Sequence, residues 1–339
     1  MKKRLIPTLM LHAIGVSAAA LALTVCAAFI ATLVAGMLSS CEHKELCEPE
    51  AATAKVHVVF DWRKAPGATA ASMSLYLYPE GGGEMLRYDF PNAAGGTVEI
   101  PRGTYRALYM NNDTEAVLLR GMEQYNTFEA YTRPAYLLEP LGLQVNPVGA
   151  NPSEEAVALP SDRFWAGRDG KVEIVPPVST SAPYDREIIF YPEEETSTYT
   201  VEMRNVQNLK YVSALSFSLS GLSGNVLVAN GMRSPLRTTI PFEGQVYETS
   251  GSIKAKTHGF GSSASSNRLR TLILYVILSD GSKQYYTFDV SKQVNEAFNP
   301  KNVYILIDGL TLPKPIVDGS GGFNPTVDDW VKEEVEMDL

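Results

Sequence analysis

Short runs of β-branched and aromatic residues, separated by glycine, proline and polar turns, are the feature that most restricts how this chain can fold. Residues 55–62 form one such run, and residues 72–78 form another. In the second run Met73, Leu75 and Leu77 alternate with serine and tyrosine, which predicts a strand with one buried face. No run of helical periodicity interrupts these segments. The pattern predicts an all-β protein built as antiparallel β-sandwiches.

A proline-rich segment, residues 175–183, separates the runs into two blocks. We therefore predict one sandwich over residues 55–182 and a second over residues 183–339. In the second block Asp280-Gly281 predicts a tight hairpin turn, and Ser291 is expected to cap a short helix over residues 291–298. The other expected strands are residues 97–100, 104–110, 198–203, 212–219, 272–278, 285–288 and 302–307.

The N-terminus has the composition of an export signal. Lys2, Lys3 and Arg4 are followed by an apolar run that carries no charged residue until Glu42. The run ends in Leu-Ser-Ser-Cys at Cys41, where small residues precede the cysteine as a lipoprotein peptidase requires. We predict that residues 1–40 are a lipoprotein signal peptide and that Cys41 is lipidated and becomes the first residue of the mature chain. Several acyl chains on one residue would give lasting membrane attachment.

Two alternatives remain open for this segment. The apolar run is longer than the roughly 20 residues that span a membrane, so it could be an uncleaved signal anchor. Cys26 also lies within the run, although it follows Val25, and lipidation there would leave an oily stretch on the mature protein. In either case we expect the rest of the chain to lie outside the cytoplasm.

Charge and cysteine content restrict the classes of function that we expect. Cleavage before Cys41 would leave 299 of the 339 residues, with 26 basic and 38 acidic residues after the loss of Lys2, Lys3 and Arg4, and a net charge of −12. An acidic chain of this kind is not expected to bind nucleic acid, which requires a basic surface. Residues 41–54 are polar and acidic and are expected to form a tether, in which Cys47 is a lone thiol.

The sequence contains no recognisable catalytic or metal-binding motif. Zinc-protease, phosphate-loop and serine-hydrolase signatures are missing, and His43, His57 and His258 lie far apart along the chain. His57 fits a packed or edge position in its strand better than a ligand position. We therefore predict a protein that is not an enzyme and that uses no cofactor or metal. A pair of catalytic carboxylates stays open, because 38 acidic residues offer many pairs.

Aromatic residues suggest an alternative role as a glycan-binding surface lipoprotein. Trp62, Phe164-Trp165 and Trp330, together with 17 tyrosines, could form a platform on which sugars stack. The simpler interpretation is that these side chains pack inside the sandwiches, since aromatic residues are enriched in strands.

The C-terminal segment predicts an amphipathic strand after a flexible joint. Glycines at 319, 321 and 322 precede residues 331–339, in which Val331, Val335, Met337 and Leu339 share one face. The simpler interpretation is the last strand of the second sandwich. The alternative is a strand that pairs with a partner protein, where main-chain hydrogen bonds supply affinity.

Three stretches resemble a family of Bacteroidales lipoproteins related to the anchor subunits of fimbriae. They are residues 40–47 with 56–62, residues 205–212 with 218–224, and residues 303–310. The resemblance covers essentially the whole mature chain. It implies two tandem transthyretin-like β-sandwich domains, export to the outer membrane, and a position at the cell-proximal base of a fimbrium.

The resemblance also implies roles for the N-terminal residues and for the partners. The acidic residues that follow Cys41 look like a surface-export signal. The implied partners are fimbrial subunits, bound by β-strand contacts, and the outer membrane, bound through the lipid. The expected function is therefore that of a lipid-anchored fimbrium anchor or accessory subunit.

Overall fold

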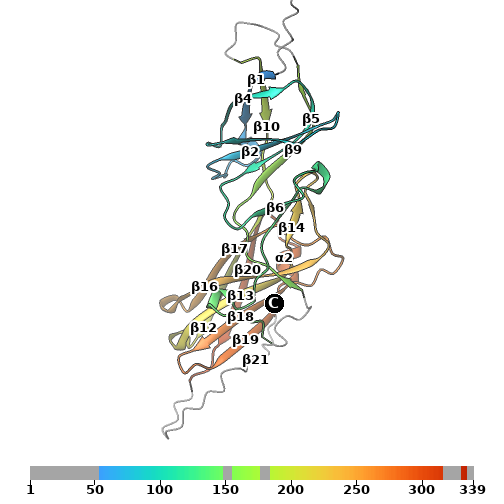
Figure 1. The fold of residues 1–339 in the computed structure, drawn as a ribbon. Helices are drawn as coiled ribbons and strands as arrows, with labels where there is room; N and C mark the ends of the chain where they lie inside the picture. The colour runs from blue at the N-terminus through green and yellow to red at the C-terminus, as the bar shows by residue number, and fades with distance from the viewer. Residues whose placement is uncertain (1–52, 148–154, 176–183, 316–329, 334–339) are drawn as a thin grey trace, which may run out of the picture. The chain divides into compact units, whose positions relative to one another are not determined.

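The computed structural model describes residues 53–147, 155–175, 184–315 and 330–333. More than half of the described residues lie in strands, and these are joined by loops, 3₁₀ turns and one short helix (Figure 1). No helix among them is long and apolar enough to cross a membrane. The all-β prediction is confirmed.

Two sheets enclose the first sandwich core. The smaller sheet has the order β10-β1-β4, with β1 (Thr53–Phe60), β4 (Gly95–Pro101) and β10 (Arg186–Phe190). The larger sheet has the order β11-β9-β5-β2-β3, with β2 (Met73–Pro79), β3 (Leu86–Phe90), β5 (Gly103–Asn111), β9 (Trp165–Ile174) and β11 (Glu193–Glu194). Val56 and Val58 of β1 pack in one core with Leu75 and Leu77 of β2.

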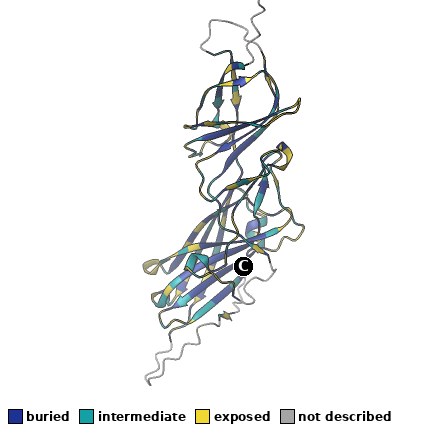
Figure 2. Ribbon diagram, viewed as in Figure 1, coloured by how far each residue is buried: buried dark blue, intermediate teal, exposed yellow. Residues whose placement is uncertain are grey.

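Within the larger sheet, β2 is buried on both faces, which corrects the expectation of one buried face for residues 72–78. All residues of β2 from Met73 to Tyr78 are buried (Figure 2). On the second face, Tyr76 lies edge-on to Phe128, with 4.9 Å between ring centroids. The side chains of residues 72–78 do alternate between two faces, as predicted. Residues 117–130 cover the second face with an apolar layer, and the pattern of one strand does not reveal such a covering segment.

That second layer includes a small sheet with the order β15-β14-β7-β6. Its strands are β6 (Leu118–Arg120), β7 (Glu129–Tyr131), β14 (Asn225–Leu227) and β15 (Met232–Arg233). Because β7 precedes residue 182 and β14 follows it, this sheet joins the two halves of the chain. The strands β10 and β11 also follow Ala182 and yet pair with β1 and β9. The sheets therefore do not divide at residue 182, and the two-domain boundary stays a prediction.

The second core lies between two layers that belong to one nine-stranded sheet. Its main path is β20-β12-β17-β16-β13-β18-β19-β21, and β8 pairs beside β16. The strands are β8 (Ala156–Val157), β12 (Ser197–Gln207), β13 (Val212–Ser223), β16 (Arg237–Tyr247), β17 (Ser252–Gly259), β18 (Thr271–Leu278), β19 (Lys283–Asp289), β20 (Asn302–Thr311) and β21 (Val331–Glu333).

Strand β16 connects the two layers of this core. It pairs with β13 as far as Glu243 and with β17 from Gly244 onward. A Cβ atom at Gly244 would come within 2.4 Å of Leu215 Cδ1 and 2.7 Å of Phe217 Cε2, so the close approach requires glycine. Leu219 of β13 and Ile305 of β20 belong to the same buried cluster, which gives the sandwich its interior.

The strands are not all antiparallel, which corrects part of the fold prediction. Four pairs are parallel: β1 with β10, β12 with β20, β8 with β16, and β19 with β21. Parallel neighbours need long crossover connections, and strand patterns in a sequence carry no information about them.

The hairpin and the helix differ in how closely they match the sequence. The β18–β19 hairpin is present, and Gly281 has φ 82° in its turn. The helix α2 (Ser291–Asn295) is shorter than expected, and its N-cap is Val290 rather than Ser291. The Ser291 hydroxyl instead accepts a hydrogen bond from the Arg270 backbone N–H at 2.8 Å, because tertiary contact brings that donor close. The 3₁₀ turns are Trp62–Lys64, Tyr125–Thr127, Glu139–Leu141, Leu209–Tyr211 and Glu248–Ser250.

Candidate functional site

Cys41, the predicted lipidation site, lies outside the described residues, as do the predicted signal peptide and all but the last two residues of the tether. The lipidation prediction therefore stays a prediction. Among the described residues, no group of three or more His, Cys, Asp or Glu side chains could hold a metal ion.

The tryptophans do not form an exposed platform. Trp165 is 2 % exposed and meets Trp62 edge-on, with 6.2 Å between ring centroids. The Trp62 indole N–H donates to the Ala93 carbonyl at 2.8 Å. Trp330 packs in a different cluster, edge-on to Tyr275 at 5.8 Å. These side chains therefore serve as packing residues, and they give no support to the aromatic-platform alternative.

The two described histidines are also packed residues. His57 Nδ1 lies 3.1 Å from the Thr97 hydroxyl, and its ring stacks on Tyr184 at 5.0 Å. His258 Nδ1 lies 3.0 Å from the Thr198 hydroxyl. Burial lowers the pKa of His258 below its ordinary value of 6.5, and the nearby Lys256 ammonium lowers it further.

Acid is expected to destabilise the fold partly through His258. Because the pKa of His258 is lower in the folded chain, the unfolded chain binds the proton first, and the unfolding free energy falls as pH drops below about 6.5. Urea midpoints at pH 7.5 and pH 5.5 measure this loss. In His258→Asn, which retains a polar atom near Thr198, the loss between these pH values should be smaller. An equal loss in both proteins would contradict the prediction.

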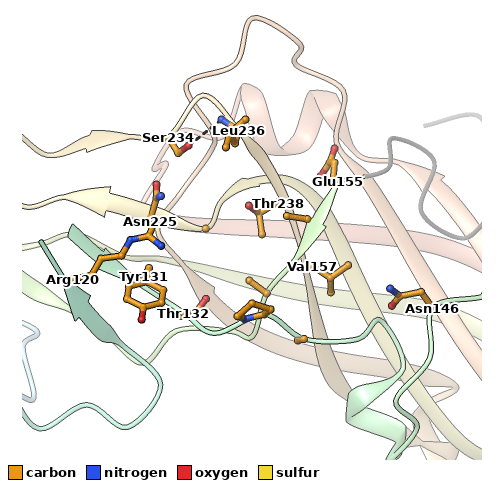
Figure 3. A pocket seen from close by; sticks show the side chains of 15 residues that line it. Arg120, Tyr131, Thr132, Asn146, Glu155, Val157, Asn225, Ser234, Leu236 and Thr238 are labelled. Atoms are coloured by element: carbon orange, nitrogen blue, oxygen red, sulfur yellow. Dashed lines mark hydrogen bonds between the residues drawn. The ribbon is translucent and has the colours of Figure 1, made fainter. Parts of the chain in front are cut away.

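A cavity of about 500 Å³ lies where the small sheet meets β8 and β16 (Figure 3). We call it the β8 groove. Arg120 of β6 and Tyr131 of β7 line one side, and Val157 of β8 and Thr238 of β16 line another. Leu236 also lines the groove and is 74 % exposed. The volume lies in the range that binding sites usually have, which makes the β8 groove a candidate binding surface.

The strand that forms one wall of the groove is very short. β8 pairs with β16 through two residues only, with Ala156 opposite Thr238 and Val157 opposite Thr239. Hydrogen bonds on its other side come from the segment that follows β7. The Ala135 N–H donates to the Val157 carbonyl at 3.0 Å, and the Leu159 N–H donates to the Arg133 carbonyl at 3.0 Å.

A buried ion pair holds the start of this short strand. Arg237 Nε donates to Glu155 Oε1 at 2.7 Å, and the two side chains are only 10 % and 3 % exposed. Glu155 Oε2 accepts two further hydrogen bonds, from the Gly221 N–H at 2.9 Å and from the Thr239 hydroxyl at 3.1 Å. The carboxylate therefore joins β8 to β13 and β16, and its desolvation is compensated by charge and by hydrogen bonds.

The groove also adjoins an open sheet end. β6 is the end strand of its four-stranded sheet among the described residues. Arg120 in β6 forms an ion pair with Glu129 and lies 4.6 Å from the Tyr131 ring centroid. An end strand has main-chain donors and acceptors on one side that a partner strand can use. Sequence reasoning missed this groove, because its walls come from segments more than 100 residues apart.

The C-terminal segment forms a strand, as predicted, in the residues that can be described. β21 pairs in parallel with β19, with Val331 opposite Gln284, and stands at one end of the nine-stranded sheet. This matches the simpler interpretation, a last strand of the second sandwich. Val331 is 51 % exposed, so the apolar face expected for it is not covered at this position. Residues 334–339 lie outside the described part, and strand exchange stays a prediction.

Comparison with known proteins finds a family model and a relative named as a fimbrial subunit. A family model described as "Domain of unknown function (DUF5119)" matches residues 40–243. A Bacteroides ovatus protein named "Putative fimbrium anchoring subunit Fim4B" is 23% identical over 331 residues, which cover 88% of this chain and 93% of that protein.

Two solved structures have a fold similar to that of this chain. A crystal structure titled as a "putative adhesin" from Bacteroides ovatus has a TM-score of 0.57 and 20% identity, and the match covers 81% of this chain and 98% of that chain. A second "putative adhesin" structure from Bacteroides ovatus has a TM-score of 0.50 and 9% identity, with coverage of 80% and 90%. The resemblance noted in the sequence is confirmed. Because the family model matches more than half of the chain, this protein belongs to the family described as domain of unknown function DUF5119.

Proposed function

We propose that this protein is a lipid-anchored protein of the outer-membrane surface that serves as the anchor or an accessory subunit of a fimbrium and is not an enzyme. The observation that supports this most is the similarity over 88% of the chain to a protein named as a fimbrium anchoring subunit. In this proposal Cys41 carries the lipid, residues 42–54 form the tether, and the remaining residues form two tandem transthyretin-like sandwiches, with β10 and β11 in the first and β8 in the second.

The β8 groove is the surface proposed to contact a fimbrial subunit. A partner strand would pair with the open side of β6 and place an apolar side chain in the groove against Leu236. Main-chain hydrogen bonds would give affinity, and the cavity would select the side chain. The exposure of Leu236 supports this, since covering an apolar side chain removes it from water.

Leu236→Asp is expected to weaken capture of fimbrial subunits by about tenfold or more, the loss typical of a central interface residue. The reason is that a carboxylate would be desolvated in the contact. Capture is measured by immobilising the full chain and adding subunits released from fimbriae of the native cell. Phe298→Asp is the matched control, because Phe298 is likewise a large exposed apolar residue and lies outside the groove. Equal capture by both variants would exclude the groove as the contact surface.

A further inference from the structure

The outer face of the second sandwich carries a groove that the fimbrial role does not use. On β17, Ile253 and Ala255 point into the core, so Lys254, Lys256 and His258 lie on the opposite, outer face. Two cavities of about 370 Å³ and 350 Å³ lie along this face, and both are lined by Glu243 and Lys256. We call the two together the outer-face groove.

One part of the groove is apolar, because β16 and β17 separate there. The two strands pair only from Gly244 to Tyr247, and residues 158–161 enter the space beyond. The Ala158 N–H donates to the Thr239 carbonyl of β16 at 3.1 Å, and the Ser161 N–H donates to the His258 carbonyl of β17 at 3.2 Å. Leu159 and Pro160, both partly exposed, then form an apolar wall of the larger cavity with Phe242.

The other part of the groove is polar and has an aromatic side chain. Thr200, Gln245 and Tyr247 line it, and Tyr247 is 42 % exposed. The Tyr247 hydroxyl donates to Gln245 Oε1 at 2.8 Å, which leaves the Gln245 amide N–H groups directed to solvent or to a ligand. Lys254 Nζ lies 5.6 Å from the Tyr247 ring centroid.

Positively and negatively charged side chains are balanced in the outer-face groove. Lys254 already pairs with Glu202 at 3.6 Å. Lys256 and Glu243 have opposite charge, and among the described residues neither has an ion-pair partner. A charged ligand would meet a like charge here at the same time as an opposite one. The lining therefore favours a neutral ligand that offers both hydrogen-bond donors and acceptors.

We propose that the outer-face groove binds a neutral oligosaccharide that contains an N-acetylated hexosamine. The C–H face of one sugar ring packs on Tyr247, since this face is apolar while the ring edge carries hydroxyls. Those hydroxyls bond with Gln245, Lys256 and Glu243. The acetamido methyl group packs against Leu159 and Pro160. Small-molecule sites typically combine an apolar wall with a few polar groups in this way, in cavities of roughly this size.

The test uses the full chain in detergent and the probe N,N′-diacetylchitobiose, with binding followed by titration calorimetry and saturation-transfer NMR. Tyr247→Ala is expected to weaken binding at least fivefold. Tyr184→Ala is the matched control, because Tyr184 is partly exposed, stacks on His57 in the first sandwich and lies outside both cavities. Both side chains are on the surface, and thermal melting checks that each variant remains folded. Lactose, which lacks the acetamido group, is expected to bind the unmodified chain at least fivefold more weakly.

Binding of chitobiose that depends on Tyr247 but not on Tyr184 supports the proposal. The absence of binding at 20 mM probe overturns it, as does an equal effect of the two tyrosine variants. Equal affinity for lactose overturns the assignment of the acetamido group to Leu159 and Pro160. If Tyr247→Ala instead lowers capture of fimbrial subunits and chitobiose does not bind, the face contacts protein, and the sugar proposal fails while the fimbrial role stands.

Discussion

Replacement of Cys41 by alanine is expected to abolish acylation and to release the protein from the cell surface. Each buried methylene contributes about 0.8 kcal/mol, and one acyl chain gives only marginal membrane binding, so lasting attachment depends on the several chains carried by one cysteine. Among the described residues, no helix could span a membrane. If the protein holds the base of a fimbrium, filaments should then be shed into the medium or change in length.

The Cys41 experiment is made in the native cell by metabolic labelling with a fatty acid, surface protease digestion and measurement of fimbriae in the medium. Cys47→Ala is the matched control, because this second cysteine lies six residues away in the predicted tether. Cys26→Ala tests the alternative lipidation site. Lost acylation with unchanged fimbriae would exclude the anchor role. Retained membrane attachment of Cys41→Ala together with loss in Cys26→Ala would move the lipid to Cys26.

Removal of the Glu155 carboxylate is expected to have the largest effect on stability. Glu155→Ala should lower the free energy of unfolding by about 3–5 kcal/mol, because it leaves Arg237 as a buried cation without its partner. The Gly221 N–H and the Thr239 hydroxyl would also lose their acceptor. Urea denaturation of the full chain in detergent, followed by circular dichroism, measures the change.

A matched control separates burial from charge. Glu193 Oε1 accepts from Lys64 Nζ at 2.6 Å, nearly the same distance, but the side chains are 55 % and 53 % exposed. Glu193→Ala should cost only about 0–1 kcal/mol, since exposed ion pairs contribute little. If Glu155→Ala does not fold, Glu155→Gln retains the shape and provides the measurement. A loss equal to that of the Glu193 variant would show that the buried pair does not hold β8.

The buried pair also bears on function, because Glu155 starts the strand that lines the β8 groove. The variant Glu155→Gln is therefore expected to capture fimbrial subunits less well even at temperatures where it remains folded. Leu236→Asp should lower capture without lowering stability. Comparison of the two variants therefore distinguishes a changed groove shape, in Glu155→Gln, from a lost apolar contact, in Leu236→Asp.

Much of the local structure follows from the sequence. The β-branched and aromatic run 55–62 and the apolar run 272–278 predict strands that the structure contains, and Asp280-Gly281 predicts a turn in which Gly281 has φ 82°. These features depend on backbone preferences and on side-chain periodicity, both of which are properties of neighbouring residues. The residue pattern at the N-terminus likewise predicts lipidation of Cys41, because export signals are recognised as linear segments.

The β8 groove could not be predicted from such local sequence patterns. Ala156 and Val157 form too short a run to stand out, and nothing in the sequence links them to Thr238 and Thr239. Glu155 is one of 38 acidic residues, and its role depends on Arg237, 82 residues later. The expected cap at Ser291 failed for a similar reason, since its hydroxyl bonds with Arg270.

The sequence by itself determined the all-β class, several of the strands, among them β2, β5 and β18, and the hairpin turn at Asp280-Gly281, but it did not predict β9, β16 or β17. Lipid attachment at Cys41 stays a prediction from the sequence. Only the tertiary structure decided that β2 is buried on both faces, that four strand pairs are parallel, that Trp165 is packed, and where the grooves lie. The physical reason is that alternation along a strand reports the polarity of its faces, whereas pairing, covering layers and cavities depend on which distant segments come together.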